Sequence, residues 1–240
     1  MIISESLMSL INRNGLSQKT SKFGTDKSFP HSYIQNLYEE IFVSFPTISS
    51  ILEIGVWKGA SCALWKLKSP RALVVGVDIH IGEMHPIAAK FRDDGKIEIH
   101  ENDAYSDEFM MNEKRDFDLI IDDGPHTIES QIKALKFRRK LSPRGLLVIE
   151  DVQDGAIDFW KLRRSLPKEE RDLCCWISFS NTSYRFDDAV FIYSPSIEAI
   201  GKLRSIGQSF SFWGVRHPFL HYPYRAWTRL QVFLSNREYC

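Results

Sequence analysis

Two stretches of this sequence decide the fold, and they read DLIIDDGPH at residues 118–126 and GLLVIED at residues 145–151. In each stretch a short apolar run is followed at once by acidic residues. Such runs are typical of strands that are buried on both faces of a parallel sheet, and ligands of these sheets bind beyond the carboxyl ends of the strands. The sequence therefore predicts one crevice that receives the polar residues after both strands: Asp122, Asp123, His126, Glu150 and Asp151.

The rest of the chain alternates strand and helix signals around these two runs. We expect strands at 51–54, 73–77, 97–100, 118–122 and 145–149, with helices at 60–68, 86–92, 106–112, after His126, and at 156–165. The helix after His126 is expected to present Ile128, Ile132 and Leu135 on one face and to end at 138–140. Strand-like runs at 173–179 and 189–193 predict a terminal antiparallel pair. This order predicts an α/β fold with a doubly wound, mostly parallel sheet.

We divide the chain into three parts. Residues 1–46 form a helical N-terminal segment, in which Tyr33, Leu37, Ile41 and Phe42 recur at helical spacing and are expected to pack on the core. Residues 47–195 form the central α/β domain. Residues 196–240 form a C-terminal arm, rich in aromatic and basic residues.

Composition sets broad limits on function. The 240 residues are 43% hydrophobic, and 31 basic residues balance 31 acidic ones, so bulk charge gives no reason to expect a nucleic-acid partner. Cys62, Cys174, Cys175 and Cys240 lack metal-ligand spacing, and we expect a reduced, cytoplasmic setting. We expect no signal peptide, and no run reaches the roughly 18 apolar residues of a spanning helix.

A glycine-rich turn, EIGVWKG at residues 53–59, follows the first predicted strand and opens a helix. Glycines at Gly55 and Gly59 let the backbone approach a ligand closely. Their Gly-x-x-x-Gly spacing lacks the tight glycine of dinucleotide-binding enzymes, which argues against a pyrophosphate cradle. Asp78 ends the second strand, where an acid accepts hydrogen bonds from ribose hydroxyls, and Asp103 follows the third, where it could meet an adenine edge. Ordinary turn glycines and a helix-capping Asp78 are the alternative.

These motifs resemble those of class I S-adenosylmethionine-dependent methyltransferases. A narrower resemblance rests on GTDK at residues 24–27 and on the two acidic stretches, which look like those of the metal-dependent sugar O-methyltransferases of macrolide and polysaccharide pathways. The resemblance covers about residues 20–155. The family commonly has Ser where Pro125 stands, and its macrolide members carry a larger N-terminal region.

The resemblance implies S-adenosylmethionine and Mg²⁺, or another divalent cation, as cofactors. It implies Asp123, Glu150 and Asp151 as metal ligands and His126 as the general base. The residues that we expect to bind the cofactor are Glu53, Gly55, Gly59, Asp78, Asp103, Asp122 and Lys27, with Lys27 near the methionine carboxylate. By analogy His31 and Tyr33 are substrate-pocket candidates. The alternatives stay open: His126 could cap its own turn, the Glu150–Asp151 pair could cap the next helix, and His31 and Tyr33 could be core or surface residues.

The chemistry of such a site follows from general principles. Mg²⁺ prefers oxygen ligands in octahedral geometry, so three carboxylates would leave about three positions, enough for two vicinal hydroxyls. A metal lowers the pKa of a bound hydroxyl, and an imidazole can then accept the proton near neutral pH. The resulting oxygen would attack the methyl group of the sulfonium in line.

The sequence thus predicts an O-methyltransferase that acts on a hydroxyl of a sugar or a glycosylated metabolite. Two alternatives are an O-methyltransferase of a catechol-like small molecule and a non-catalytic scaffold that retains the fold. We expect a homo-oligomer. Residues 208–240 interleave aromatic residues with arginines, which suits a packing arm or oligomer contact, a substrate lid, or contact with a membrane surface.

Overall fold

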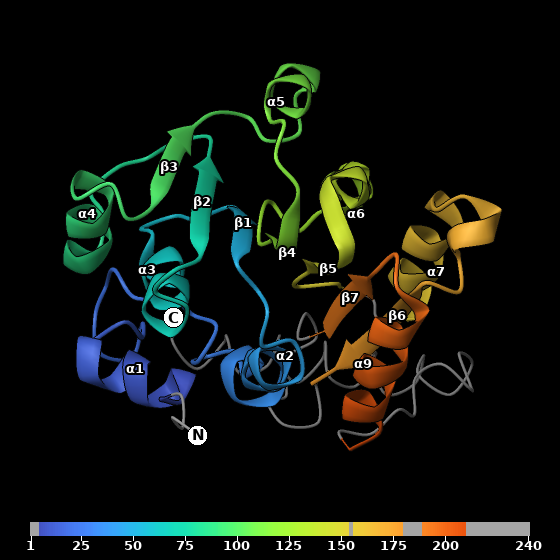
Figure 1. Cartoon of the computed structure of the whole chain (residues 1–240), viewed down its shortest axis with the longest axis horizontal. Helices are drawn as coiled ribbons and strands as arrows, with labels where there is room; N and C mark the ends of the chain where they lie inside the picture. Colours follow the sequence, from blue (N-terminus) through green and yellow to red (C-terminus); the bar gives the residue numbers. More distant parts are fainter. Residues whose placement is uncertain (1–4, 154–155, 180–188, 210–240) are drawn as a thin grey trace, which may run out of the picture.

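A seven-stranded sheet forms the centre of the molecule (Figure 1). The structure is a computed structural model that describes residues 5–153, 156–179 and 189–209. The strand order is β3-β2-β1-β4-β5-β7-β6; β1 to β5 are parallel, and β7 runs antiparallel to β5 and β6. The predicted doubly wound sheet and its terminal antiparallel pair are confirmed. The strands are β1 (Ser50–Ile54), β2 (Leu73–Asp78), β3 (Glu98–Glu101), β4 (Phe117–Asp122), β5 (Leu141–Ile149), β6 (Cys174–Ser178) and β7 (Ala189–Tyr193).

Helices follow most of the strands, as the alternating sequence signals predict. Ser6, Ser106 and Thr127 cap the first turns of α1, α5 and α6 with their side-chain oxygens, which explains where these helices begin. The α-helices are α1 (Leu7–Asn14), α2 (Glu39–Ser44), α3 (Ala60–Lys68), α4 (Pro86–Asp93), α5 (Asp107–Asn112), α6 (Ile128–Ala134), α7 (Ala156–Ser165) and α9 (Ile197–Ser209). A π-helix spans Ile34–Tyr38, and 3-10 helices span Leu135–Lys140 and Lys168–Glu170.

The central strands β1, β2 and β4 and the second half of β5 are buried on both faces, which is why they read as continuous apolar runs. Neighbouring residues of one strand point to opposite sides: in β1, Ile51 belongs to one hydrophobic cluster and Leu52 to the other. The first cluster includes residues of α1, α2, α3 and α9, and the second includes residues of α5, α6 and α7. Two helical layers therefore enclose the sheet.

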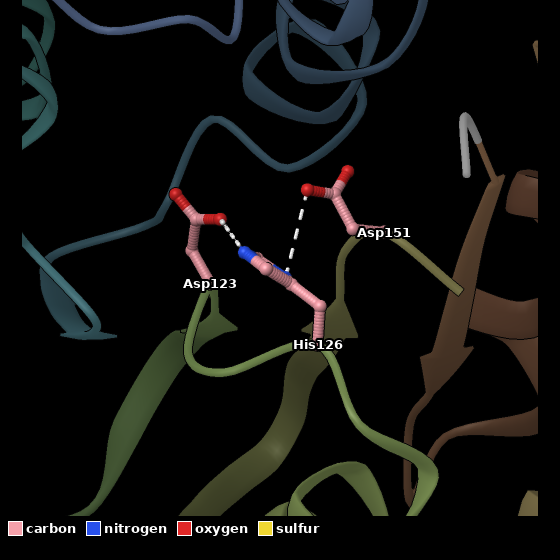
Figure 2. Close-up of side chains that lie close together, drawn as sticks. All are labelled: Asp123, His126 and Asp151. Atoms are coloured by element: carbon pink, nitrogen blue, oxygen red, sulfur yellow. Dashed lines mark ion pairs between the residues drawn. The ribbon is translucent and has the colours of Figure 1, made fainter. Parts of the chain in front are cut away.

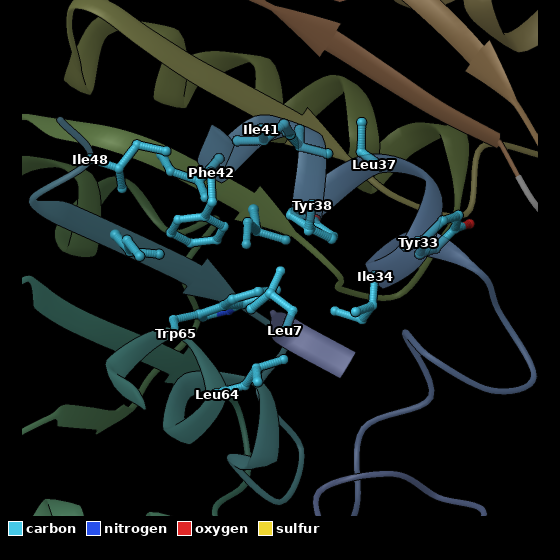
Figure 3. Close-up of a cluster of buried hydrophobic side chains, with 14 of the residues drawn as sticks. Leu7, Tyr33, Ile34, Leu37, Tyr38, Ile41, Phe42, Ile48, Leu64 and Trp65 are labelled. Atoms are coloured by element: carbon cyan, nitrogen blue, oxygen red, sulfur yellow. The ribbon is translucent and has the colours of Figure 1, made fainter. Parts of the chain in front are cut away.

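The N-terminal segment shares the first of these clusters (Figure 3). Leu7, Tyr38 and Phe42 pack beside Leu64 and Trp65 of α3, and the Tyr38 and Trp65 rings lie 4.9 Å apart. Replacing a buried aromatic ring of this kind by alanine costs about 3–5 kcal/mol. The segment is therefore part of the main core, and the predicted burial of its apolar residues, among them Leu37 and Ile41, is confirmed.

Two details of the sequence prediction are wrong. Ile132 is 37% exposed, and α6 instead buries Ser130, Gln131 and Ala134. Gln131 is buried because its side chain donates to the backbone oxygens of Glu150 and Asp151, at 3.1 and 3.2 Å. Strand β5 also begins at Leu141 rather than 145, because its polar first half, residues 142–144, hides the strand signal.

The C-terminal arm can be described only through α9, which packs on β6 and α2. The roles predicted for residues 208–240 fall almost entirely on residues 210–240, outside the described residues. Among the helices that the structure describes, none is long and apolar enough to cross a membrane.

Candidate functional site

The predicted acidic crevice forms because strand pairing continues just beyond β4 and β5. In the parallel pair, Asp122 lies opposite Ile149, so the residues that follow them leave the sheet side by side. The Asp123 amide donates to the Ile54 oxygen at 2.8 Å, and the Glu150 amide donates to the Asp122 oxygen at 2.9 Å. These backbone bonds fix where both acidic stretches turn away from the sheet.

Asp123, His126 and Asp151 come together at this edge (Figure 2). The His126 ring lies between the two carboxylates, with Nε2 3.8 Å from Asp123 Oδ1 and Nδ1 3.5 Å from Asp151 Oδ2. One ligand atom from each of the three residues lies within 4.8 Å of the other two, which is close enough to hold a metal ion. His126 Nδ1 is buried without a hydrogen-bond partner in the described part of the chain.

The backbone at this cluster is unusual. His126 and Asp151 have φ angles of +57° and +51°, in the left-handed region that residues with side chains rarely adopt. Strained conformations of this kind cost about 1–3 kcal/mol each and concentrate at functional sites. Both residues are held in this conformation where their side chains face each other.

Glu150 lies behind this cluster, beside Lys27. Its Oε2 is 2.5 Å from Lys27 Nζ, and its Oε1 accepts a hydrogen bond from the Tyr38 hydroxyl. Burial raises the pKa of Glu150 to about 7, although the charge of Lys27 opposes this shift. The sequence predicted Asp123, Glu150 and Asp151 as the metal ligands. The cluster in the structure consists of Asp123, Asp151 and His126, and Glu150 is not part of it.

Lys27 is placed among acids rather than at the mouth of a cavity. Its ammonium nitrogen lies 2.6 Å from Asp123 Oδ2 and 3.4 Å from Glu53 Oε1, in addition to Glu150, and the side chain is 1% exposed. Burial alone would lower the pKa of Lys27, but the surrounding carboxylates raise it well above its ordinary value. The buried lysine is therefore charged and paired.

His31 and Tyr33 contact Asp151 from the N-terminal side. The Tyr33 hydroxyl donates to Asp151 Oδ1 at 2.6 Å, and His31 Nδ1 lies 3.7 Å from the same oxygen. Their rings stack with centroids 4.9 Å apart, and both side chains are buried. These two predicted pocket residues thus orient an acid of the cluster.

A cavity of about 600 Å³ adjoins the cluster, and Asp123 lines it. Three predicted cofactor-binding residues, Gly55, Asp78 and Asp103, also line it. Asp78 Oδ2 accepts a hydrogen bond from the Trp57 amide at 2.8 Å, and Asp103 Oδ1 accepts one from the Tyr105 amide at 2.9 Å. The two acids are therefore fixed by the backbone while they border the cavity.

Gly55 is required where the cavity wall meets the acidic stretch. Its φ is +80°, and a β-carbon there would lie 2.0 Å from the Asp123 backbone oxygen. A side chain at this position would push apart the ends of β1 and β4. Gly59, also at positive φ, faces Ala88 of α4 and Met84, which precedes that helix, so its role lies in close packing against this region.

Glu53 and Asp122 are buried behind the wall and are not among the residues that line the cavity. Glu53 Oε2 accepts a hydrogen bond from Trp65 Nε1 at 3.0 Å. Asp122 Oδ1 accepts one from the Tyr105 hydroxyl at 2.5 Å, and burial raises the pKa of Asp122 to about 7. Neither carboxylate borders the space where we expected it to meet a cofactor.

Sequence reasoning missed Tyr38, Tyr105 and Gln131, which bind Glu150, Asp122 and the backbone of residues 150–151. Each is an ordinary helix or loop residue in the sequence, and nothing in the local pattern links it to an acid far along the chain. Only the folded structure brings these pairs together.

Part of this chain is similar in sequence to known methyltransferases. Residues 52–152 match a family model described as a methyltransferase domain. The chain is 32% identical over 149 residues to mycinamicin VI 2''-O-methyltransferase of Micromonospora griseorubida, covering 57% of this chain and 36% of the relative. It is 30% identical over 154 residues to 8-demethyl-8-alpha-L-rhamnosyl tetracenomycin-C 2'-O-methyltransferase of Streptomyces olivaceus, covering 58% and 38%. The chain thus spans little more than a third of the length of these relatives.

Solved structures with similar folds share less sequence. The MycE methyltransferase of the mycinamycin pathway, in complex with Mg and SAH, is 20% identical, with 81% of this chain and 50% of that chain covered and a TM-score of 0.46. The StiE O-MT structure is 14% identical, with 87% and 74% covered and a TM-score of 0.48. Overlaps at this level give no information about the site.

Proposed function

We propose that this chain transfers the methyl group of S-adenosylmethionine to a hydroxyl of a sugar or glycosylated metabolite with the help of a divalent cation. The match of residues 52–152 to a methyltransferase-domain model supports this proposal. Both named relatives are O-methyltransferases, one of them acting on a rhamnosyl tetracenomycin. One observation carries the proposal: Asp123 both lines the 600 Å³ cavity and belongs to the cluster with His126 and Asp151. The cation site and the methyl donor would therefore be neighbours.

The cavity suits the methyl donor. Asp78 at the end of β2 would accept hydrogen bonds from the ribose hydroxyls, and Asp103 after β3 would meet the adenine edge. Gly55 lines the same cavity and lets the backbone after β1 pack directly against the Asp123 backbone. This placement directs the sulfonium end of the donor toward Asp123.

The residues of the cluster fit a divalent cation. Asp123 Oδ1 and Asp151 Oδ2 supply hard oxygen donors beside a buried His126 nitrogen that makes no hydrogen bond within the described residues. Burial and the charge of Glu150 hold the pKa of Asp123 well above its ordinary value, although Lys27 opposes this shift. Asp123 and Asp151 would hold the ion, and Glu150 could join them by sharing an oxygen that Lys27 or Tyr38 contacts. When bound, Mg²⁺ would make an acceptor hydroxyl more acidic and fix its position.

His126 would act as the base. The acceptor hydroxyl gives its proton to an imidazole nitrogen, and the oxygen forms a bond to the methyl carbon as the carbon–sulfur bond breaks. The products are the methyl ether, S-adenosylhomocysteine and a protonated imidazole, which releases its proton to water. Asp123 and Asp151, on either side of the ring, stabilise that positive charge (Figure 2).

Calorimetry and a methyl-transfer assay test this proposal. S-Adenosylmethionine is titrated into the full chain with and without Mn²⁺, and transfer is then measured to sugar, glycoside and catechol acceptors. We expect cofactor binding, and methyl transfer to a sugar hydroxyl that disappears in excess chelator. Preferential transfer to catechols would show that the acceptor is a catechol-like molecule and not a sugar. If the chain does not bind S-adenosylmethionine, a non-catalytic scaffold is favoured.

A further inference from the structure

Lys27 occupies an uncommon position for a lysine, because it is fully buried among carboxylates from three neighbouring strands. Glu53 belongs to β1, Asp123 directly follows β4, and Glu150 directly follows β5. These strands are adjacent in the sheet. One ammonium group, with three hydrogens to donate, thus lies where the three strands converge.

The N-terminal segment reaches each acid of the predicted metal set. Lys27 contacts one oxygen of Asp123 and one of Glu150, Tyr38 contacts the other oxygen of Glu150, and Tyr33 contacts one oxygen of Asp151. The remaining oxygens of Asp123 and Asp151 are those that face His126 (Figure 2). The contacts therefore decide which oxygen of each aspartate is presented to a ligand.

Among these contacts, that of Lys27 brings a positive charge to the acids. Its nitrogen lies 2.6 Å from Asp123 Oδ2 and 2.5 Å from Glu150 Oε2, and charge-assisted hydrogen bonds of this length are about twice as strong as neutral ones. Without the ammonium group, two buried carboxylates that now share one nitrogen would repel each other and separate. The orientation of Asp123 thus depends on Lys27.

We propose that Lys27 is a positioning residue of the acidic site, whose ammonium group holds Asp123 and Glu150 so that the free oxygen of Asp123 faces Asp151 and His126. The proposal rests on the divalent-cation site of the proposed function. It assigns to the N-terminal segment, which lies outside the matched domain of residues 52–152, a direct part in building that site.

Binding of Mn²⁺ to the full-length chain, followed by electron paramagnetic resonance, tests this role. Lys27→Met keeps the length of the side chain and removes its charge. We expect it to weaken Mn²⁺ binding at least tenfold and to change the affinity for S-adenosylmethionine less than threefold, because Lys27 does not line the donor cavity. The matched control is Lys22→Met, an exposed lysine of the same segment that contacts the Phe23 ring, and it should leave both affinities unchanged.

The outcomes separate the role of Lys27 from the proposed function. A folded Lys27→Met variant that binds Mn²⁺ as tightly as wild type, or more tightly, overturns the positioning role; a purely structural lysine would lower the melting temperature only. If that variant does not fold, Lys27→Gln decides, because its neutral amide can still donate hydrogen bonds; we expect a loss of at least threefold in Mn²⁺ affinity, and no loss overturns the proposal. If the wild-type chain binds no Mn²⁺, the metal dependence of the proposed function fails instead.

Discussion

At the scale of single residues, the site is built from acids whose two oxygens have different partners. Asp151 Oδ1 accepts a hydrogen bond from Tyr33, and its Oδ2 faces His126. Asp123 Oδ2 accepts a hydrogen bond from Lys27, and its Oδ1 faces the same ring. In each aspartate one carboxylate oxygen accepts a hydrogen bond, and the other faces His126, where a ligand could bind. Such division leaves little freedom of rotation, which is what a preorganised ligand site requires.

His126→Asn tests the base directly. Asparagine tolerates the left-handed φ of +57° better than alanine does, so this variant removes the imidazole and keeps the backbone. Loss of a general base typically lowers turnover by about 10²–10⁴-fold, and we expect a fall in kcat of this order with S-adenosylmethionine affinity unchanged. Steady-state kinetics and calorimetry measure the two quantities. A wild-type kcat would remove His126 as the base.

Gly55→Ala tests the close approach of the cavity wall to residue 123. A β-carbon there would meet the Asp123 backbone at 2.0 Å and require a left-handed alanine. We expect the variant to lose more than about 3 kcal/mol of stability, or to fold with donor affinity greatly reduced. Gly95→Ala is the control, because its φ of +66° carries the backbone cost without any atom within 4 Å. Equal unfolding free energies for the two variants, measured in urea, would contradict the steric argument.

At the scale of elements, the side chain of Asp118 in β4 forms hydrogen bonds with the starts of β1 and β5. Its Oδ2 accepts hydrogen bonds from the Ser49 amide and hydroxyl at 2.8 and 2.9 Å and from the Ser50 amide at 3.2 Å, and its Oδ1 accepts one from the Ser142 hydroxyl at 2.7 Å. Burial would raise the pKa of Asp118, but these hydrogen bonds outweigh it and lower the pKa below its ordinary value. The charged form therefore stabilises the junction of β1, β4 and β5.

This junction predicts a pH dependence of stability. Because the folded-state pKa of Asp118 is depressed, its contribution is present above the ordinary value of 3.8 and is lost as the pH falls through the lower folded-state pKa. Asp118→Asn should cost about 1 kcal/mol at pH 7, after allowance for partial exposure, and less as the pH falls through that range. Urea unfolding at pH 7 and at pH 3 checks this expectation. A destabilisation that stays the same at both values would contradict it.

The sequence was sufficient to predict most elements but few of the contacts between them. Parallel strands such as β4 can be predicted from apolar runs that end in acidic residues. The family resemblance implied that these acids bind a metal ion. The polar first half of β5 and the exposure of Ile132 were missed because local pattern cannot show which face a neighbour covers. Likewise, Lys27 and Asp123 are 96 residues apart, and no local signal connects them.

At the scale of the whole molecule, the fold joins the N-terminal segment, the sheet and the site into one unit. Leu7 and Tyr38 are buried in the core (Figure 3), and the Tyr38 hydroxyl also donates a hydrogen bond to Glu150. A ligand that binds the folded state at this edge should therefore stabilise the described part of the chain as one unit.

Addition of Mn²⁺ should accordingly raise the melting temperature. At a free concentration of 100 times Kd the added stability is about 2.7 kcal/mol, which for a chain of this size is a shift of roughly 5–10 °C. Differential scanning calorimetry measures it. Asp151→Asn, which suits the φ of +51°, is the control and should show little shift. An equal shift in this variant would place the bound ion elsewhere.

The most direct test of the account is anomalous diffraction from crystals grown with S-adenosylhomocysteine and soaked in Mn²⁺. We predict one strong peak within bonding distance of carboxylate oxygens of Asp123 and Asp151, next to the cavity that Gly55 and Asp78 line. A well-ordered site with S-adenosylhomocysteine bound and no manganese peak at these acids would contradict the claim that the ends of β4 and β5 hold a cation beside the methyl donor.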